Sequence, residues 1–260
     1  MALNEYGWFL DGHPSGTLVA ASGGASIAAG KYYFEVTLVD SGNGSDSGWG
    51  MAVGIASATM TSLFDIVDAA VNNPQAASTQ ANFFTVKDNT SNGAGWGYPL
   101  RPTGISPVAE GAVIGVAVNT IAKTIYWRNV TTASVWNLDA ASDPVTGAGT
   151  TNLWSAAGSS PITGNIYILV GADLGNSGGF GSAYTEEGRG TVNFGASAFT
   201  GTAPTGYVSI ESVFAGAALN PNDNSDLTLS NGNLSFAGFS RNATYSNPFC
   251  ACRSRFTIAV

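Results

Sequence analysis

Hydrophobic and polar residues alternate along several stretches of the chain with the period of two that is typical of β-strands. The clearest stretch is KYYFEVTLVD, residues 31–40, in which every second residue from Tyr32 to Leu38 is apolar. The residues between them, Glu35 among them, fall on the opposite face of the strand. We therefore predict a strand with one apolar face turned to a core and one polar face.

The segment EGAVIGVAVNTIAKTIYWRNV, residues 110–130, predicts a hairpin with its turn at residues 119–124. Residues 113–118 carry apolar or small side chains on both faces, a pattern typical of a strand deep inside a layered fold. MAVGIAS (residues 51–57) and NIYILVG (residues 165–171) predict further buried strands. The period of two recurs too often for a helical fold.

Other parts of the chain do not follow this period of two throughout. GTVNFGASAF, residues 190–199, predicts one more strand, and residues 203–212 predict an exit segment. SLFDIVDAAVNN, residues 62–73, predicts a short helix with Ser62 as its N-cap. The long polar connections around it, up to residue 104 and again at residues 140–164, indicate loops that either carry function or pack on themselves.

Composition supports an all-β fold. Charged residues make up 10% of the 260 residues, against about 25% in typical domains, so the exposed faces of many helices could not be supplied. The 34 glycines indicate many turns. The net charge of −8 makes nucleic acid and anionic membrane surfaces poor partners. No apolar run is long enough for a membrane span, and the first residues do not resemble a signal peptide, so synthesis in a cytoplasm is expected.

Five segments in this order resemble one known family. They are GKYYFEV, GWGMAVGIA, EGAVIGVAVNTIAKTIYW, NIYILVGADLG and TVNFGASAFTGTAPTGYVSI, and together they cover about residues 27–210. This succession resembles the SPRY domain, most closely the SPRY modules encoded by bacteriophages and prophages. The resemblance implies a two-layer antiparallel β-sandwich of the concanavalin-like jelly-roll type. It also implies a binding module without catalysis, whose ligand lies against variable loops at one rim.

The sequence departs from the family at several points. The hairpin turn usually begins with Asp, where this chain has Asn119, and the strand that follows usually ends in Asn-Gly, where it has Asn129 and Val130. The insertion at residues 57–104 is longer than usual. The fold expectation survives these changes, but ligand-binding roles in the loops cannot be carried over.

The resemblance divides the chain into a SPRY-like sandwich, residues 1–212, and a C-terminal extension, residues 213–260. Residues 220–238 resemble the segment that precedes the GKYYFEV strand in phage modules, and RSRFTIAV, residues 253–260, stops where a second such strand would begin. The extension therefore looks like the leading strands of a second module. We expect it to form strands either against its own module or against a neighbouring copy.

Candidates for catalysis and metal binding are sparse. His13 is the single histidine and lies in a Gly/Pro segment, so a nucleophilic triad has little to build on. A glycosidase needs two facing carboxylates. The side chains of adjacent Glu186 and Glu187 would diverge. Glu35 is the best single candidate, but no second acid visibly pairs with it. The cysteines, Cys250 and Cys252, read as reduced and partly buried thiols.

Oxygen-rich turns at residues 40–46 and 223–226 could supply calcium ligands, yet their spacing does not fit an EF-hand and ordinary polar turns explain them. We expect no enzyme activity, no cofactor and no metal.

Aromatic side chains in the irregular segments are the better functional lead, because exposed aromatics stack on sugar rings or anchor protein interfaces. The candidate ligand-binding residues of the rim loops are Trp49, Asn92, Trp96, Tyr98, Arg101, Trp136, Trp154, Phe180 and Tyr184.

The resemblance and the composition together predict a phage virion protein, made in the host cytoplasm, that serves as a capsid decoration or as a head- or tail-fibre component. Its expected partners are copies of itself, other virion proteins and a host-surface glycan, with no insertion into a membrane. Two other classes stay open: an intracellular protein-recognition adaptor and a concanavalin-like polysaccharide hydrolase.

Overall fold

The computed structural model describes residues 26–41, 51–57, 76–80, 111–149, 164–173, 188–225, 227–232, 234–238, 249–254 and 256–260. Within these residues the fold is all-β, with two sheets of seven strands each and one short 3-10 helix, η4 (Trp136–Leu138). The helix predicted at residues 62–73 lies outside the described residues. The all-β prediction is confirmed.

The first sheet, called sheet I, is organised around β7. This strand has β3 along one edge, and β13 and β14 follow one another along its other edge. Outside these lie β4, β10 and β1. The strands of sheet I are β1 (Ser26–Ile27), β3 (Met51–Ser57), β4 (Ala76–Gln80), β7 (Ile166–Asp173), β10 (Leu219–Ser225), β13 (Phe249–Ser254) and β14 (Thr257–Ile258).

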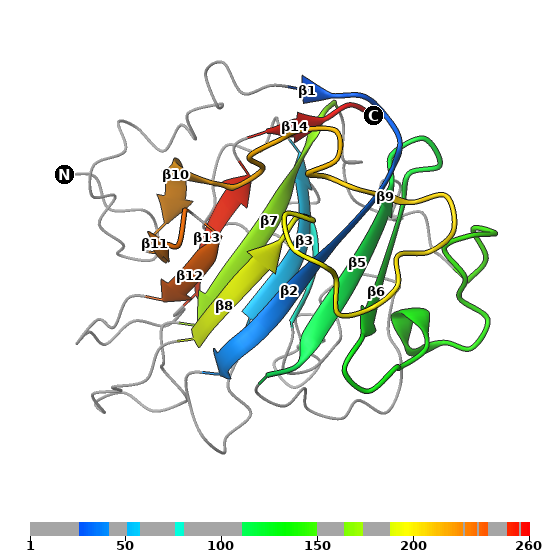
Figure 1. The fold of residues 1–260 in the computed structure, drawn as a ribbon, viewed down its shortest axis with the longest axis horizontal. Coiled ribbons are helices and arrows are strands. Elements are labelled where there is room, and N and C mark those ends of the chain that lie inside the picture. Colours follow the sequence, from blue (N-terminus) through cyan, green and yellow to red (C-terminus); the bar gives the residue numbers. More distant parts are fainter. Residues whose placement is uncertain are drawn as a thin grey trace, which may run out of the picture.

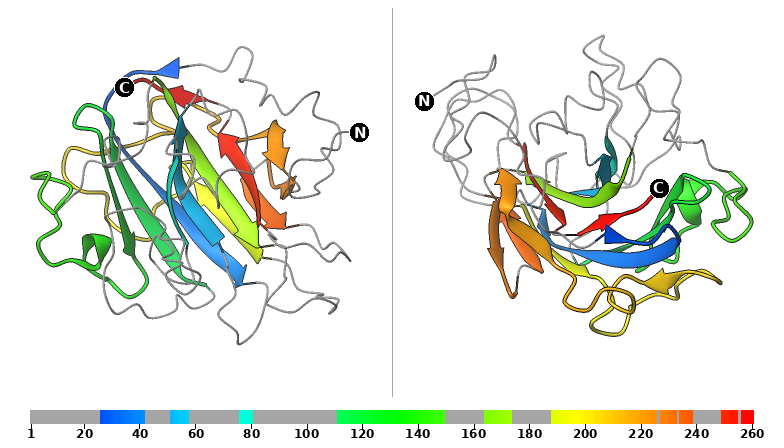
Figure 2. Two further views of the ribbon diagram at one scale, coloured as in Figure 1. Left: turned by 180° about the vertical axis from the view of Figure 1, so that it is seen from behind. Right: turned by 90° about the horizontal axis from the view of Figure 1, so that it is seen from above.

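The second sheet, sheet II, has the order β11-β12-β8-β2-β5-β6, with β9 beside β2. The two sheets lie one above the other as the layers of a sandwich (Figure 1; Figure 2, right). The strands of sheet II are β2 (Lys31–Ser41), β5 (Val113–Asn119), β6 (Thr124–Asn129), β8 (Gly188–Asn193), β9 (Val208–Ser209), β11 (Leu227–Ser230) and β12 (Ser235–Gly238).

The predicted hairpin is confirmed as β5 and β6, with β5 also antiparallel to β2. All seven residues of β5 are buried, as its two apolar faces predict. Asn119 begins the turn by accepting hydrogen bonds at Oδ1 from the backbone N–H groups of Ile121 and Ala122. An asparagine thus performs the turn-capping role that an aspartate side chain can also perform.

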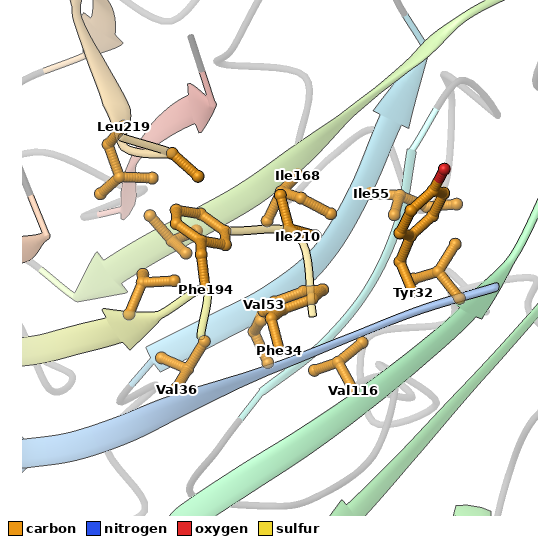
Figure 3. Packing of buried hydrophobic residues seen from close by; sticks show 14 of the residues in the cluster. Tyr32, Phe34, Val36, Val53, Ile55, Val116, Ile168, Phe194, Ile210 and Leu219 are labelled. Carbon is orange, nitrogen blue, oxygen red and sulfur yellow. The ribbon is translucent and has the colours of Figure 1, made fainter. Parts of the chain in front are cut away.

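The core lies between the sheets and is built from the inward residues of both (Figure 3). Phe34 and Val116 of sheet II meet Val53 and Ile168 of sheet I, and all four are fully buried. The indole Nε1 of Trp127 donates to the backbone oxygen of Val53 over 3.0 Å, which adds a directional bond between the layers. Period-two alternation therefore identified the core face correctly.

The opposite face of β2 differs from its prediction. Tyr33 and Glu35 were expected on a polar, outward face, but they are 0% and 2% exposed. The face is covered because residues 195–207 fold back over it, as the hydrogen bonds of Glu35 to Thr200 and Gly201 demonstrate. Alternation describes the two faces of a strand but does not reveal that a later segment covers the second one.

Two further expectations need correction. The strand predicted at residues 190–199 ends at Asn193, because the Asn193 side chain accepts from Gly195 N and donates to the carbonyls of Ser197 and Ala198. The sheets are also not wholly antiparallel. β1 pairs with β14, and β9 with β2, in the parallel sense.

The C-terminal extension forms strands of both sheets in its own chain. β12 pairs with β8 of sheet II, whereas β13 pairs with β7 of sheet I. Phe236, Cys252 and Phe256 from this extension belong to the core cluster. Cys252 is fully buried, deeper than the partial burial expected from the sequence.

Replacement of Phe256 by alanine should destabilise the whole sandwich. The ring is fully buried and meets Phe194 edge to face at a centroid distance of 5.4 Å. Removing such a ring costs about 3–5 kcal/mol of unfolding free energy, measurable by urea denaturation. The matched control is Val213→Ala, at a residue 50% exposed in the same extension, for which we expect a change within about 0.5 kcal/mol. A loss below about 1 kcal/mol for Phe256→Ala would contradict this packing.

Candidate functional site

A second cluster of aromatic residues lies on the outer face of sheet II, away from the core. We call it the outer aromatic layer. Its buried members come from β2, β5, β6 and the segment before β9, and three partly buried residues from the covering loops pack against them. The layer consists of Tyr33, Ala117, Tyr126 and Tyr207, with Trp136, Phe199 and Ala203.

Small residues on β5 make room for this layer. The strand register places Gly115 opposite both Glu35 of β2 and Arg128 of β6. A Cβ at Gly115 would overlap the Tyr33 hydroxyl. Because Gly115 has no side chain, the Tyr33 phenol has room over it. The Tyr33 hydroxyl donates to Glu35 Oε1 over 2.8 Å.

Glu35 fixes one of the covering loops to the sheet. Its Oε2 accepts a hydrogen bond from Thr200 N, and its Oε1 accepts one from Gly201 N, each over 2.8 Å. With the Tyr33 hydroxyl, the carboxylate therefore has three donors and almost no contact with solvent. Phe199 completes the attachment by packing edge to face on Tyr33, with ring centroids 4.9 Å apart. Glu35 is a structural anchor in this arrangement.

Two tyrosines fix the other covering loop, residues 130–149. The Tyr207 hydroxyl donates to Pro144 O over 3.0 Å, and the Tyr126 hydroxyl donates to Ala148 O over 3.1 Å. Burial raises the pKa of the Tyr207 phenol well above its ordinary value of 10.0. Burial also raises the pKa of Tyr33, helped by the Glu35 carboxylate. Both phenols remain neutral hydrogen-bond donors at any ordinary pH.

The same loop covers the edge of β6, the outermost strand of sheet II. Asn137 Oδ1 accepts from Trp127 N, and Ser134 Oγ accepts from Asn129 N, each over 2.9 Å. Asn137 adopts a left-handed backbone conformation with φ of 51°, which asparagine tolerates better than most residues. These side chains occupy N–H groups that an edge strand would otherwise offer to a foreign strand.

Trp136 is the one predicted rim residue that lies among the described residues. Its ring is half-buried. The guanidinium carbon of Arg128 lies 4.6 Å from the ring centroid, and Tyr126 packs edge to face at 6.5 Å. Arg128 also donates from Nη2 to Thr202 O over 2.9 Å. Trp136 and Arg128 thus join the two covering loops while remaining partly accessible.

Two donors beside Trp136 have no hydrogen-bond partner among the described residues. They are Arg128 Nε and Asn137 Nδ2, and both atoms are buried. Buried donors of this kind are uncommon in native proteins. Their position beneath the surface means that a ligand at Trp136 would reach them only if the loop shifted.

The other predicted rim residues, Trp49, Asn92, Trp96, Tyr98, Arg101, Trp154, Phe180 and Tyr184, lie outside the described residues, as do His13, Glu186 and Glu187. No group of three or more His, Cys, Asp or Glu side chains in the described part of the chain is arranged to hold a metal ion. None of its helices has the length and hydropathy that crossing a membrane requires.

Sequence reasoning missed Arg128, Asn137 and Tyr207 as parts of this site. One signal was available for them: two of the outward positions of β5 are small, Gly115 and Ala117, and small residues let another layer approach closely.

No protein-family model matches the chain, and no curated protein matches it significantly.

Replacing Glu35 with glutamine should loosen the covering loop. The amide keeps one acceptor but directs an NH₂ group at backbone N–H groups, so one donor loses its partner, at a cost of about 1–3 kcal/mol of unfolding free energy. The control is Glu211→Gln, because Glu211 also accepts two backbone N–H bonds, from Gly216 and Ala217, in a more exposed setting. An equal effect of the two changes by urea denaturation would contradict the buried-anchor role.

Alkaline pH should weaken the fold through the buried phenols. The unfolded chain releases tyrosine protons near the ordinary pKa of 10.0, whereas folded Tyr207 retains its proton. The stability that this difference contributes is fully present below that unfolded pKa, and it is lost progressively as the pH rises from there towards the higher pKa of folded Tyr207. Tyr207→Phe should therefore lose less unfolding free energy than the parent between neutral pH and about pH 10.5. Equal losses in parallel urea titrations would contradict this.

Proposed function

We propose that the chain is a SPRY-like β-sandwich of the concanavalin type that acts as a non-enzymatic binding and structural protein of a bacteriophage virion. One observation carries the proposal. Segments that resemble the family, KYYFEV in β2, VIGVAV in β5 and IYW in β6, are consecutive neighbours in sheet II. NFG and PTGY, which close the family module, lie where the chain folds back over this sheet.

The chemistry of Glu35 favours a binder over a hydrolase. A glycosidase acid must face a cleft and exchange protons with substrate. Glu35, the best carboxylate of the sequence, is instead buried and engaged by three donors. A sandwich whose loops carry aromatic side chains beside an arginine suits recognition of a glycan or a protein surface. Display in many copies would multiply a weak affinity about 10²–10⁴-fold.

Binding through the Trp136 surface can be tested on a glycan array and on immobilised host-surface polysaccharide. We expect Trp136→Ala to lower affinity about tenfold or more, since exposed aromatic anchors contribute more than 1 kcal/mol. Trp136→Phe should lose less, because it keeps an aromatic face. Val145→Ala, at an exposed valine of the same loop, is the control for unspecific effects. Thermal melts of each variant separate lost binding from lost folding.

The other function classes are outcomes of the same set of measurements. Release of reducing sugar from the polysaccharide would establish a hydrolase and end the proposal. Affinity that is indifferent to Trp136→Ala would remove Trp136 from the site. Mass spectrometry of purified phage particles tests the virion location directly, and absence of the chain from them would favour the intracellular adaptor.

A further inference from the structure

The last residues of the chain lie in the interior of a sheet. β13 is inserted between β7 and β10, and β14 lies between β7 and β1 (Figure 1). All the strands that pair with β13 and β14 precede them in the sequence. Residues 249–260 therefore connect β10 and β1 to the rest of sheet I. Without them, one edge of β7 would have no paired strand among the described residues.

Every second residue from Cys252 to Ile258, in the segment that pairs with β7, is buried. Cys252, Ser254, Phe256 and Ile258 are all fully buried. Ser254 allows the segment to bend between its two strands, because its Oγ accepts from Ile168 N over 3.1 Å and donates to Phe256 O over 2.7 Å. The contacts are those of an interior strand.

The end of the segment pairs with β1, a strand of two residues. β14 runs parallel to β1 with Thr257 opposite Ser26 and Ile258 opposite Ile27, so like residues lie side by side. Asn165 Nδ2 donates to both hydroxyls, over 3.1 Å to Ser26 and 3.3 Å to Thr257. This recognition depends only on the strand itself, and the same strand of another copy would satisfy it equally.

We propose that residues 249–260 form an exchangeable strand, and that a second copy of this chain can insert its own residues 249–260 beside β7. The strand contacts are the same in the closed and the exchanged forms, so the balance between them is set by concentration. A strand on the same chain is present at an effective concentration of about millimolar. Ten residues, 239–248, separate this segment from β12, and a chain of ten residues spans at most about 35 Å.

This inference deepens the structural role in the proposed function and depends on that role only for its biological use. In dilute solution each chain closes on its own strand. Where many copies are held together, as in a shell or fibre, the neighbour's strand competes, and exchange links the copies without any new interface.

The register supplies a test on the full chain. Cys250 lies directly opposite Ala172 of β7. Directly opposed Cβ atoms are about 4.5–5.5 Å apart, close to the separation in a disulfide, so Ala172→Cys should cross-link to native Cys250. The protein is unfolded under reducing conditions, refolded at low and at high concentration, oxidised, and run on a non-reducing gel. The matched control is Ala172→Cys with Cys250→Ser.

We expect a cross-linked monomer after dilute refolding and cross-linked dimers after concentrated refolding. A tenfold higher chain concentration should raise the dimer-to-monomer ratio up to about tenfold, because the exchange is bimolecular. The control should lose both products. The unsubstituted chain, refolded at high concentration, should contain a dimer in size-exclusion chromatography that persists on dilution.

Two results would overturn the proposal. One is a gel that shows only cross-linked monomer at every concentration. This result would overturn the proposal even if chromatography detected dimers, because such dimers would associate through another surface. The other is an unsubstituted chain that stays monomeric after concentrated refolding. Either result leaves the proposed binding function standing, because the affinity of Trp136 variants is measured separately.

Discussion

The sandwich depends on residues 249–260, which complete sheet I as β13 and β14 and bury Cys252, Phe256 and Ile258 in the core. Phe256 packs against both Phe194 and Phe214 at centroid distances of 5.4 Å, and β13 connects β10 to the rest of sheet I. Hydrophobic burial is the main favourable term in folding, and here part of it requires residues 26–27 and 249–260, which are far apart in the sequence, to join the same sheet. The fold is therefore rich in contacts between distant residues, which slows folding.

Sheet II adds a second constraint, because its central strands are buried on both faces. The inner face meets sheet I, and the outer face carries the outer aromatic layer. A buried carboxylate is costly unless it is fully hydrogen-bonded, and Glu35 meets this condition with three donors. The same bonds hold the covering loop in one position. Rigid loops on a rigid sheet are what a binding surface needs, since ordering them on binding would reduce affinity.

The sequence predicted the strands well wherever alternation alone decides them. Residues 31–40, 51–57 and the hairpin at residues 113–129 became strands with the expected core faces. It failed where a distant segment decides the outcome. Nothing local to Glu35 indicates that residues 195–207 will cover it. The end of β8 at Asn193 arises from side-chain bonds to the backbone, which compete with strand pairing and leave no trace in the period of two.

The site was less predictable than the fold for a related reason. Aromatic residues in irregular segments made Trp136 a candidate, but its partner Arg128 lies on a strand, and its neighbour Asn137 matters through the edge of β6 that it covers. The edges of β6 and β7 are covered in two different ways. The loop of Trp136 supplies side-chain acceptors to β6 and so discourages addition of a foreign strand. β7, in contrast, has an edge completed by β13 and β14, which are consecutive strands of the same chain. One strand edge is thus covered by side-chain hydrogen bonds from a loop, and the other is covered by a paired strand.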